Sequence, residues 1–273
     1  MSVLPETRLF DGDRLRASMF NPGQDRLFVS FRQRTQEAGA YSEAVPVKSF
    51  VGAGYTHLHL QARLNDWYIN SETQALEAEL DRFSRQFAAV HSIGFSMGGY
   101  AALRFAKALN LSHLIAVSPQ YSIAPDHVPF DRRYRKFAKE FDPDLGGLME
   151  REHPVQGVVL ADPFRTADLV HAQMIDLVFP GMSVARLAAS GHPATQVLRQ
   201  GGKLGALQRL LRTEMVGVSQ LCKLHRTSRR GSPVYWRHLA QRAEQSGRQE
   251  LAATAERRHI QLMKDKASEK AGR

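Results

Sequence analysis

The sequence predicts a protein of the α/β class, built on a mainly parallel, doubly wound sheet and followed by an all-helical C-terminal extension. Three observations lead to this fold class. Short apolar runs alternate with helical stretches over at least five repeats before residue 202, as in a parallel sheet covered by helices on both faces. One apolar run ends in a glycine-flanked serine and continues into an alanine-rich helical stretch. From residue 203 onward only helical patterns occur.

Length and composition suit one such domain with an appendage. The chain has 273 residues, of which 43% are hydrophobic and 23% charged, so it can bury a sizeable core. It contains no run of about 18 apolar residues, and residues 1–13 lack the apolar stretch of a secretory signal. The single cysteine, Cys222, excludes an intrachain disulfide and fits a reducing compartment. We therefore expect a cytoplasmic protein with no membrane span.

Strands are expected where apolar or alternating runs are bounded by turn residues. In chain order they are 7–10, 15–19, 26–31, 55–60, the run ending at Phe95, 113–117, 156–161 and 182–187. The first two are short and weakly marked, and Asp11-Gly12-Asp13 between them is typical of a hairpin turn.

Helices are expected between these strands. The first begins at Ser71, with Gln74 completing a capping box. The second covers 97–109 and is apolar nearly all round, with Arg104 and Lys107 as its polar stripe. The remaining helices of this part are expected at 166–177 and 193–200.

Residues 119–153 interrupt the alternation. This insertion carries four prolines, two adjacent glycines and a charged, helix-like piece near 131–141. Two interpretations stand side by side: a cap over the active site, or a polar surface excursion. His127, Arg132 and Arg133 can contact an anionic group on a substrate, although no spacing ties them to a site.

The glycine-flanked serine is the strongest chemical signal. Residues 94–98 read Gly-Phe-Ser-Met-Gly between an apolar run and a helical stretch. A serine on a sharp strand-to-helix turn needs neighbours without Cβ atoms two residues away on either side, which Gly94 and Gly98 provide. The alternative is an ordinary tight turn between a core strand and a core helix.

This motif, Gly94-Phe95-Ser96-Met97-Gly98-Gly99, resembles the nucleophile turn of the α/β-hydrolase family. The resemblance covers roughly residues 1–202 and implies that Ser96 is the nucleophile. It also implies an oxyanion hole made by the backbone N–H of Met97 and a second N–H after the third strand, at Phe31 or Arg32.

The family's chain order implies a carboxylate and then a histidine after the serine. Asp162 directly follows the strand 156–161, and His192 follows the next strand. Both then lie at the sheet edge that carries Ser96, so we predict a catalytic triad of Ser96, Asp162 and His192. Asp168, in the first turn of the following helix, stays open as the alternative acid.

Other side chains are weighed for substrate or metal binding. Trp67 and Tyr68 follow a strand at the same edge, where they either wall a substrate pocket or anchor their loop to the core. His57 and His59 share one face of a strand but lack a third ligand nearby in sequence. We expect no metal site and no cofactor.

The extension, residues 203–273, carries the chain's excess charge. It holds 16 basic and 6 acidic residues, whereas residues 1–202 hold 21 of each. Helices are expected at 204–216, 233–245 and 249–263, with 225–232 as a basic linker and 264–273 disordered. The last two helices resemble a single tetratricopeptide-type hairpin, which cannot bury its own face and must dock on the body or on another copy of the chain.

The function that follows is an esterase-like serine hydrolase acting on a small-molecule acyl substrate. Two alternatives remain: an acyltransferase using the same triad, or a non-catalytic scaffold that binds a partner through its basic tail. Nucleic-acid binding is not expected, because the basic linker lacks interleaved aromatic residues. A homo-oligomer formed through the C-terminal helices is possible on this pattern.

Overall fold

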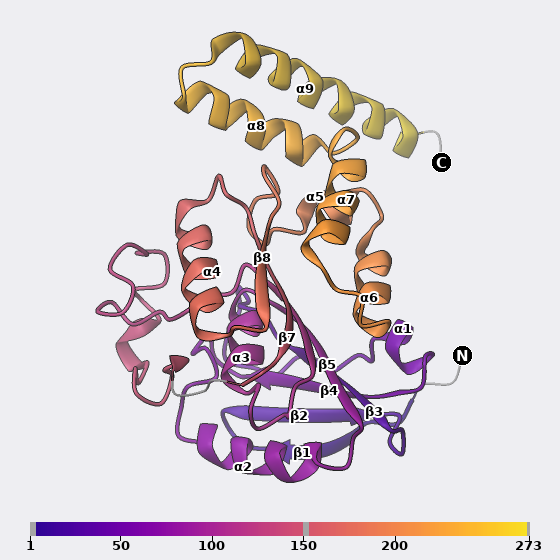
Figure 1. Ribbon diagram of the computed structural model, residues 1–273, viewed down its shortest axis with the longest axis vertical. Helices are drawn as coiled ribbons and strands as arrows, with labels where there is room; N and C mark the ends of the chain where they lie inside the picture. Colours follow the sequence, from indigo (N-terminus) through magenta and orange to yellow (C-terminus); the bar gives the residue numbers. More distant parts are fainter. Residues whose placement is uncertain (1–3, 150–152, 272–273) are drawn as a thin grey trace.

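The computed structural model describes residues 4–149 and 153–271 and contains one eight-stranded sheet, of strand order β1-β2-β4-β3-β5-β6-β7-β8 (Figure 1). The strands are β1 (Thr7–Asp11), β2 (Leu15–Phe20), β3 (Arg26–Phe31), β4 (Tyr55–Ala62), β5 (Ala89–Phe95), β6 (His113–Val117), β7 (Gln156–Ala161) and β8 (Met182–Arg186). Both pairings of β2 are antiparallel, and the other pairings are parallel. The sheet is therefore mainly parallel, as expected, with an antiparallel hairpin added at one edge.

Helices cover both faces of the sheet. They are α1 (Lys48–Val51), α2 (Thr73–Ser84), α3 (Met97–Arg104), α4 (Thr166–Val178), α5 (Gln196–Gln200), α6 (Leu204–Arg212), α7 (Val218–Arg229), α8 (Pro233–Gln245) and α9 (Gln249–Ala271). Buried residues of α2, α3 and α4 belong to the core cluster on one face, and those of α1, α5, α6 and α7 to the cluster on the other.

The side chains of β6 explain why a continuous apolar run serves both clusters. Leu114 and Ala116 belong to the first core cluster, whereas Ile115 and Val117 belong to the second. Successive side chains of a strand point to opposite faces, so a strand covered on both sides is apolar at every position. This requirement produced the short unbroken runs seen in the sequence.

Two helices differ from the expected ones. α2 begins at Thr73 rather than near Ser71. The Glu72 carboxylate, directly before it, accepts hydrogen bonds from three backbone N–H groups at the β1–β2 turn. α3 ends at Arg104, which is fully buried rather than part of an exposed stripe. The Arg104 guanidinium pairs with Glu77 at 3.0 Å and also donates to the Leu145 carbonyl.

The insertion has little regular structure in its described part. The helix expected near 131–141 is wrong, because only a single 3₁₀ turn, Ala138–Glu140, forms there. Residues 150–152 of the insertion lie outside the described part of the chain. The segment nonetheless packs into the molecule: Tyr134, Phe141 and Leu148 are buried in the first core cluster.

The core runs without interruption past residue 202, where the sequence suggested a domain boundary. Leu207 and Leu211 of α6 and Leu221 of α7 are buried in the same cluster as side chains of the central strands. The basic linker expected at 225–232 is wrong for 225–229, since α7 extends to Arg229.

The last two helices form the expected hairpin, which lies at one end of the molecule beyond α5 and α7 (Figure 1). α9 continues to Ala271, so the disorder expected for 264–273 is wrong for 264–271, and residues 272–273 lie outside the described part of the chain. Among the residues that the structure describes, no helix combines the length and the apolar character needed to cross a bilayer. The likeness to a tetratricopeptide-type repeat and the formation of oligomers stay predictions.

Candidate active site

Ser96 lies on a strained turn between β5 and α3. Its backbone has φ 50° and ψ −119°. This conformation is strained for a residue with a Cβ atom and persists only where surrounding contacts hold it in place. A Cβ atom on Gly94 would lie 2.4 Å from the Gly98 carbonyl oxygen, and one on Gly98 would lie 2.9 Å from the Phe31 carbonyl oxygen. The two glycines are thus required for the turn, as the spacing predicted.

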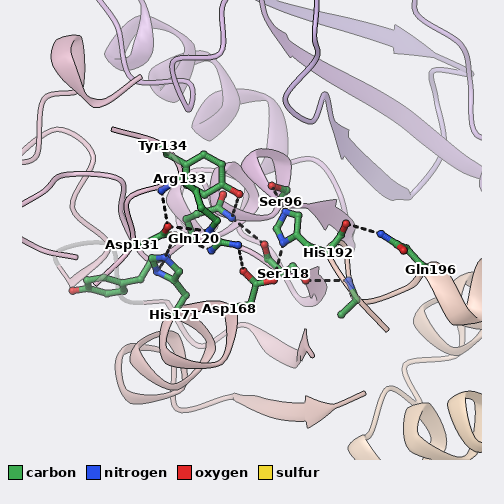
Figure 2. A network of polar contacts seen from close by, with 12 residues as sticks. Ser96, Ser118, Gln120, Asp131, Arg133, Tyr134, Asp168, His171, His192 and Gln196 are labelled. Carbon is green, nitrogen blue, oxygen red and sulfur yellow. Dashed lines mark hydrogen bonds and ion pairs between the residues drawn. The ribbon is translucent and has the colours of Figure 1, made fainter. Parts of the chain in front are cut away.

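The Ser96 hydroxyl meets His192 across the carboxyl edge of the sheet. Ser96 Oγ lies 3.0 Å from His192 Nε2, although 96 residues separate the two in sequence (Figure 2). The Ser96 side chain is nearly buried, and 24% of the His192 side chain is exposed. The structure therefore brings together the serine and the histidine that the sequence singled out.

Asp168, and not Asp162, is the carboxylate that contacts His192. Its Oδ2 lies 2.7 Å from His192 Nδ1. Because an ionised carboxylate only accepts hydrogen bonds, His192 Nδ1–H is the donor to Asp168, and Nε2 is left to accept from the Ser96 hydroxyl. Burial raises the pKa of Asp168, but the hydrogen bond and charge of His192 and the charge of Arg133 outweigh it and hold that pKa below its usual value. Asp168 is thus an ionised acceptor buried behind the histidine.

Asp162 holds the loop that carries His192. Its carboxylate accepts from the backbone N–H groups of Phe164, Ala189 and Gly191, at 2.9, 3.0 and 2.7 Å. These donors hold both oxygens of Asp162, whereas the carboxylate that the structure places at His192 Nδ1 is Asp168. The expected pairing of Asp162 with His192 is wrong for this physical reason: the carboxylate satisfies the backbone of the tight loop instead.

A second layer of charge lies behind Asp168 (Figure 2). Arg133 Nη1 lies 2.7 Å from Asp168 Oδ1, and its Nε and Nη2 donate to the two oxygens of Asp131 at 2.9 and 2.7 Å. His171 Nε2 lies 2.9 Å from Asp131 Oδ2, while its Nδ1 accepts from the Tyr121 N–H. Arg133 therefore ties the insertion to the carboxylate of α4.

The backbone around Ser96 offers donors for an oxyanion. Met97 is the first residue of α3, and the first N–H groups of a helix have no partner within it. Arg32 N–H is occupied, since it donates to the Leu60 carbonyl at 2.8 Å. Phe31 lies against Gly98, and its role as second donor stays a prediction.

Trp67 and Tyr68 are fully buried and do not line the pocket beside His192. Tyr68 Oη donates within the core, with the Arg32 and Leu60 carbonyls at 2.9 and 3.0 Å. Trp67 Nε1 donates to Gln120, and its ring packs edge-on against Tyr134. The substrate-binding role expected for the pair is replaced by the other role considered, anchoring of their loop.

A cleft of about 500 Å³ opens beside His192. Its walls include the loop after β3, the insertion, the residue before α4, and α8. The side chains that line it are Arg34, Arg133, Tyr134, Lys136, Phe137, Arg165, His192, Gln196, Arg237 and His238. The C-terminal extension thus contributes directly to the candidate site.

One group of side chains away from this cleft has the composition of a metal site. His91, His113 and Glu214 bring three ligand atoms within 4.8 Å of one another at the amino ends of β5 and β6. Burial, with a contribution from His113, lowers the pKa of His91 to about 4, so its imidazole is neutral at pH 7. The histidine pair considered from the sequence, His57 and His59, lies elsewhere, and both of these contact Ser30 Oγ at 2.8 Å.

Sequence reasoning missed the contacts made by Asp131, Arg133 and Tyr134. Tyr134 lies beside Ser96. Burial raises the pKa of the Tyr134 hydroxyl, and the charge of Arg133 and a hydrogen bond with Ser96 lower that pKa in part. These residues come from a segment without periodicity, where neither strand nor helix patterns fix the direction of a side chain. The one available signal was the density of arginines after Asp131.

Comparison with known proteins bears on the fold. No protein-family model matches the chain, and no curated protein sequence matches it. Among solved structures, the chain is similar to the capsule O-acetyltransferase of Neisseria meningitidis serogroup A, with 12% identity and a TM-score of 0.53 over 77% of this chain and 94% of that chain. It is also similar to the Pyrococcus furiosus esterase Pf2001, with 14% identity and a TM-score of 0.48 over 77% and 91%. At these identities the first likeness establishes a shared fold.

Proposed function

We propose that the protein is a serine-dependent acyl hydrolase of α/β-hydrolase type, in which Ser96, His192 and Asp168 form the catalytic triad. The observation that carries the proposal is the unbroken line of contacts from Ser96 Oγ to His192 Nε2 and from His192 Nδ1 to Asp168, at 3.0 and 2.7 Å. These contacts match what a serine needs in order to act as a nucleophile near neutral pH: a base within hydrogen-bond reach and an acid that orients it.

The chemistry follows from these positions. Ser96 Oγ attacks the carbonyl carbon of an ester or related acyl group while its proton passes to His192 Nε2, and Asp168 stabilises the imidazolium that forms. His192 then gives the proton to the leaving alcohol. Water attacks the acyl-enzyme with the same base, releasing the acid and restoring the Ser96 hydroxyl. The scheme needs no metal and no organic cofactor.

The negative charge that develops on the carbonyl oxygen requires two positioned N–H donors. Met97 supplies the first. Arg32 N–H already donates to the Leu60 carbonyl. Of the two residues considered, Phe31 therefore remains the predicted second donor.

Acyl transfer to a hydroxyl other than water is the second candidate function. It is favoured by the fold shared with an O-acetyltransferase, and it uses the same residues up to the acyl-enzyme. The two reactions separate at the second step. The protein can be incubated with an acetyl ester and glycerol, and the products identified by mass spectrometry. A transferase should form more glycerol acetate than the molar ratio of glycerol to water predicts, whereas a hydrolase should form acetate alone.

A fluorophosphonate probe tests the shared step. We expect stoichiometric labelling of Ser96 in the folded protein, loss of labelling in Ser96→Ala and in urea, and normal labelling in Ser122→Ala, a buried serine outside the contacts described. Absence of labelling in protein with a native unfolding transition would contradict the proposal.

A further inference from the structure

The cleft beside His192 is lined by cations and by no acid. Five of its side chains are basic, namely Arg34, Arg133, Lys136, Arg165 and Arg237, and none is Asp or Glu. The chain as a whole carries 37 basic against 27 acidic residues. A lining with a single sign of charge is therefore a local feature beyond what overall composition explains.

In the part of the chain that the structure describes, four of these cations have no carboxylate partner. Arg133 is neutralised by Asp131 and Asp168, but Arg34, Lys136, Arg165 and Arg237 form no ion pair with any side chain in 4–149 or 153–268. They are exposed, so each can reach a ligand in the cleft without breaking an existing pair.

Aromatic packing directs two of the cations. Lys136 Nζ lies 4.8 Å from the centroid of the Phe137 ring, and the Arg34 guanidinium lies 6.0 Å from the same centroid. A cation over an aromatic face is attracted to it and loses freedom. Phe137 thus gathers two charges from separate segments, the β3 loop and the insertion, at one wall of the cleft.

The other two cations come from different elements. Arg237 and His238 come from α8, where Arg237 Nη2 lies 3.4 Å from His238 Nε2, and Arg165 precedes α4. Burial lowers the pKa of His238, and the charges of Arg237 and Arg165 lower it further. Both arginines therefore act electrostatically on a side chain that lines the cleft.

Charges of one sign that converge on a concave site repel one another and raise the local concentration of oppositely charged ligands. We propose that this cleft selects an acyl substrate that carries an anionic group, a phosphate or a carboxylate, close to the reacting carbonyl. The inference rests on the proposed function, since the cleft opens on His192, the base assigned to Ser96. A cleft of about 500 Å³ has the size of a small-molecule site.

Matched esters test the inference with one leaving group. The 4-nitrophenyl monoester of adipic acid carries a terminal carboxylate, 4-nitrophenyl hexanoate is its neutral counterpart, and 4-nitrophenyl 6-(trimethylammonio)hexanoate is the cationic one. We expect kcat/KM to be about tenfold higher for the adipate than for the hexanoate, lowest for the cationic ester, and the adipate advantage to fall as NaCl rises. 3-Acetoxyphenyl phosphate against phenyl acetate gives the corresponding comparison for a phosphate, and the larger of the two advantages identifies the anion.

Variants locate the effect in the cleft. Lys136→Gln combined with Arg237→Gln removes one cation of the insertion and one of α8, and we expect the ratio of kcat/KM for the adipate to kcat/KM for the hexanoate to fall about fivefold or more. Arg248→Gln together with Arg257→Gln, exposed and on the same hairpin but outside the cleft, removes the same charge and leaves the preference unchanged.

The outcomes separate the two proposals. If Ser96 takes up the fluorophosphonate but neither anionic ester is preferred, or if both double variants reduce the preference equally, the anionic selectivity is overturned and the serine hydrolase stands. If Ser96 is not labelled in folded protein, the proposed function itself fails.

Discussion

The two aspartates at the carboxyl edge of the sheet perform different tasks, and the difference is visible only in their hydrogen bonds. Both follow β7 within a few residues, and both lie at the right edge for a triad. The sequence cannot distinguish them, because the number of backbone N–H groups that a loop turns toward a carboxylate depends on the path of the loop. Asp162 accepts hydrogen bonds from three backbone N–H groups, whereas Asp168 accepts one from the imidazole of His192.

Substitution of each aspartate by asparagine should therefore give opposite patterns. We expect Asp168→Asn to lower kcat/KM about 10³- to 10⁴-fold, because an amide no longer fixes the imidazole tautomer. Asp162→Asn should cost about 1–3 kcal/mol of stability, because an amide replaces the charged acceptor of three N–H donors. Steady-state kinetics and urea unfolding of both variants check this, and a loss of activity confined to folded Asp162→Asn would reverse the assignment.

The nucleophile turn gives a second prediction at this scale. Gly94→Ala places a Cβ atom 2.4 Å from the Gly98 carbonyl oxygen and 2.7 Å from Gly99 Cα, and both are backbone atoms that cannot rotate away. We expect destabilisation of about 2 kcal/mol or more together with loss of fluorophosphonate labelling. Gly205→Ala is the matched control, since a Cβ atom there meets nothing within 4 Å and lies in α6; it should raise stability by about 0.5–1 kcal/mol. Thermal unfolding of both variants provides the comparison.

At the scale of the elements, the sequence predicted every strand but misjudged how the helices after residue 203 pack. Strands were readable because apolar periodicity reports burial directly. The packing of α6 and α7 could not be predicted in the same way. An amphipathic pattern shows that one face of a helix is buried, but it does not show which element covers that face. In the structure that partner is the sheet: Leu207, Leu211 and Leu221 lie in the cluster that also holds side chains of strands β3 to β8.

Truncation of a leucine in α6 tests whether the extension belongs to the core. Leu211→Ala, at a fully buried position, should lower the free energy of unfolding by about 2–5 kcal/mol within a single cooperative transition. Leu177→Ala in α4 is the control, because that side chain is 85% exposed, and it should change stability by about 0.5 kcal/mol or less. A separate early transition in urea for the Leu211 variant would mean that α6 folds independently of the sheet.

At the scale of the whole molecule, buried neutral histidines link stability to pH. Burial lowers the pKa of His57 to about 3, with His59 adding to the effect, and lowers those of His91 and His225 to about 4. In the unfolded chain a histidine titrates near 6.5. As the pH falls below that value the unfolded state takes up protons that the folded state refuses, so the stability present above pH 6.5 is lost as the pH falls toward 4.

Urea unfolding at several pH values measures this effect. Each such histidine removes about 1.4 kcal/mol per pH unit in that window, and we expect the protein to lose several kcal/mol between pH 7 and pH 5. The His225→Gln variant lacks one of these titrating groups. The number of protons taken up on unfolding, which sets the slope of stability against pH, should therefore fall by about one. His127→Gln, at an exposed position, should leave the slope as it is. A stability that is constant from pH 7 to pH 5 would contradict the burial of these imidazoles.

The contact between Arg133 and Asp168 joins two segments that are far apart in the chain. The guanidinium belongs to the insertion, whereas the carboxylate belongs to α4, and the charge of Arg133 helps to lower the pKa of Asp168. The electrostatic environment of Asp168 therefore depends on the path of the insertion as well as on α4.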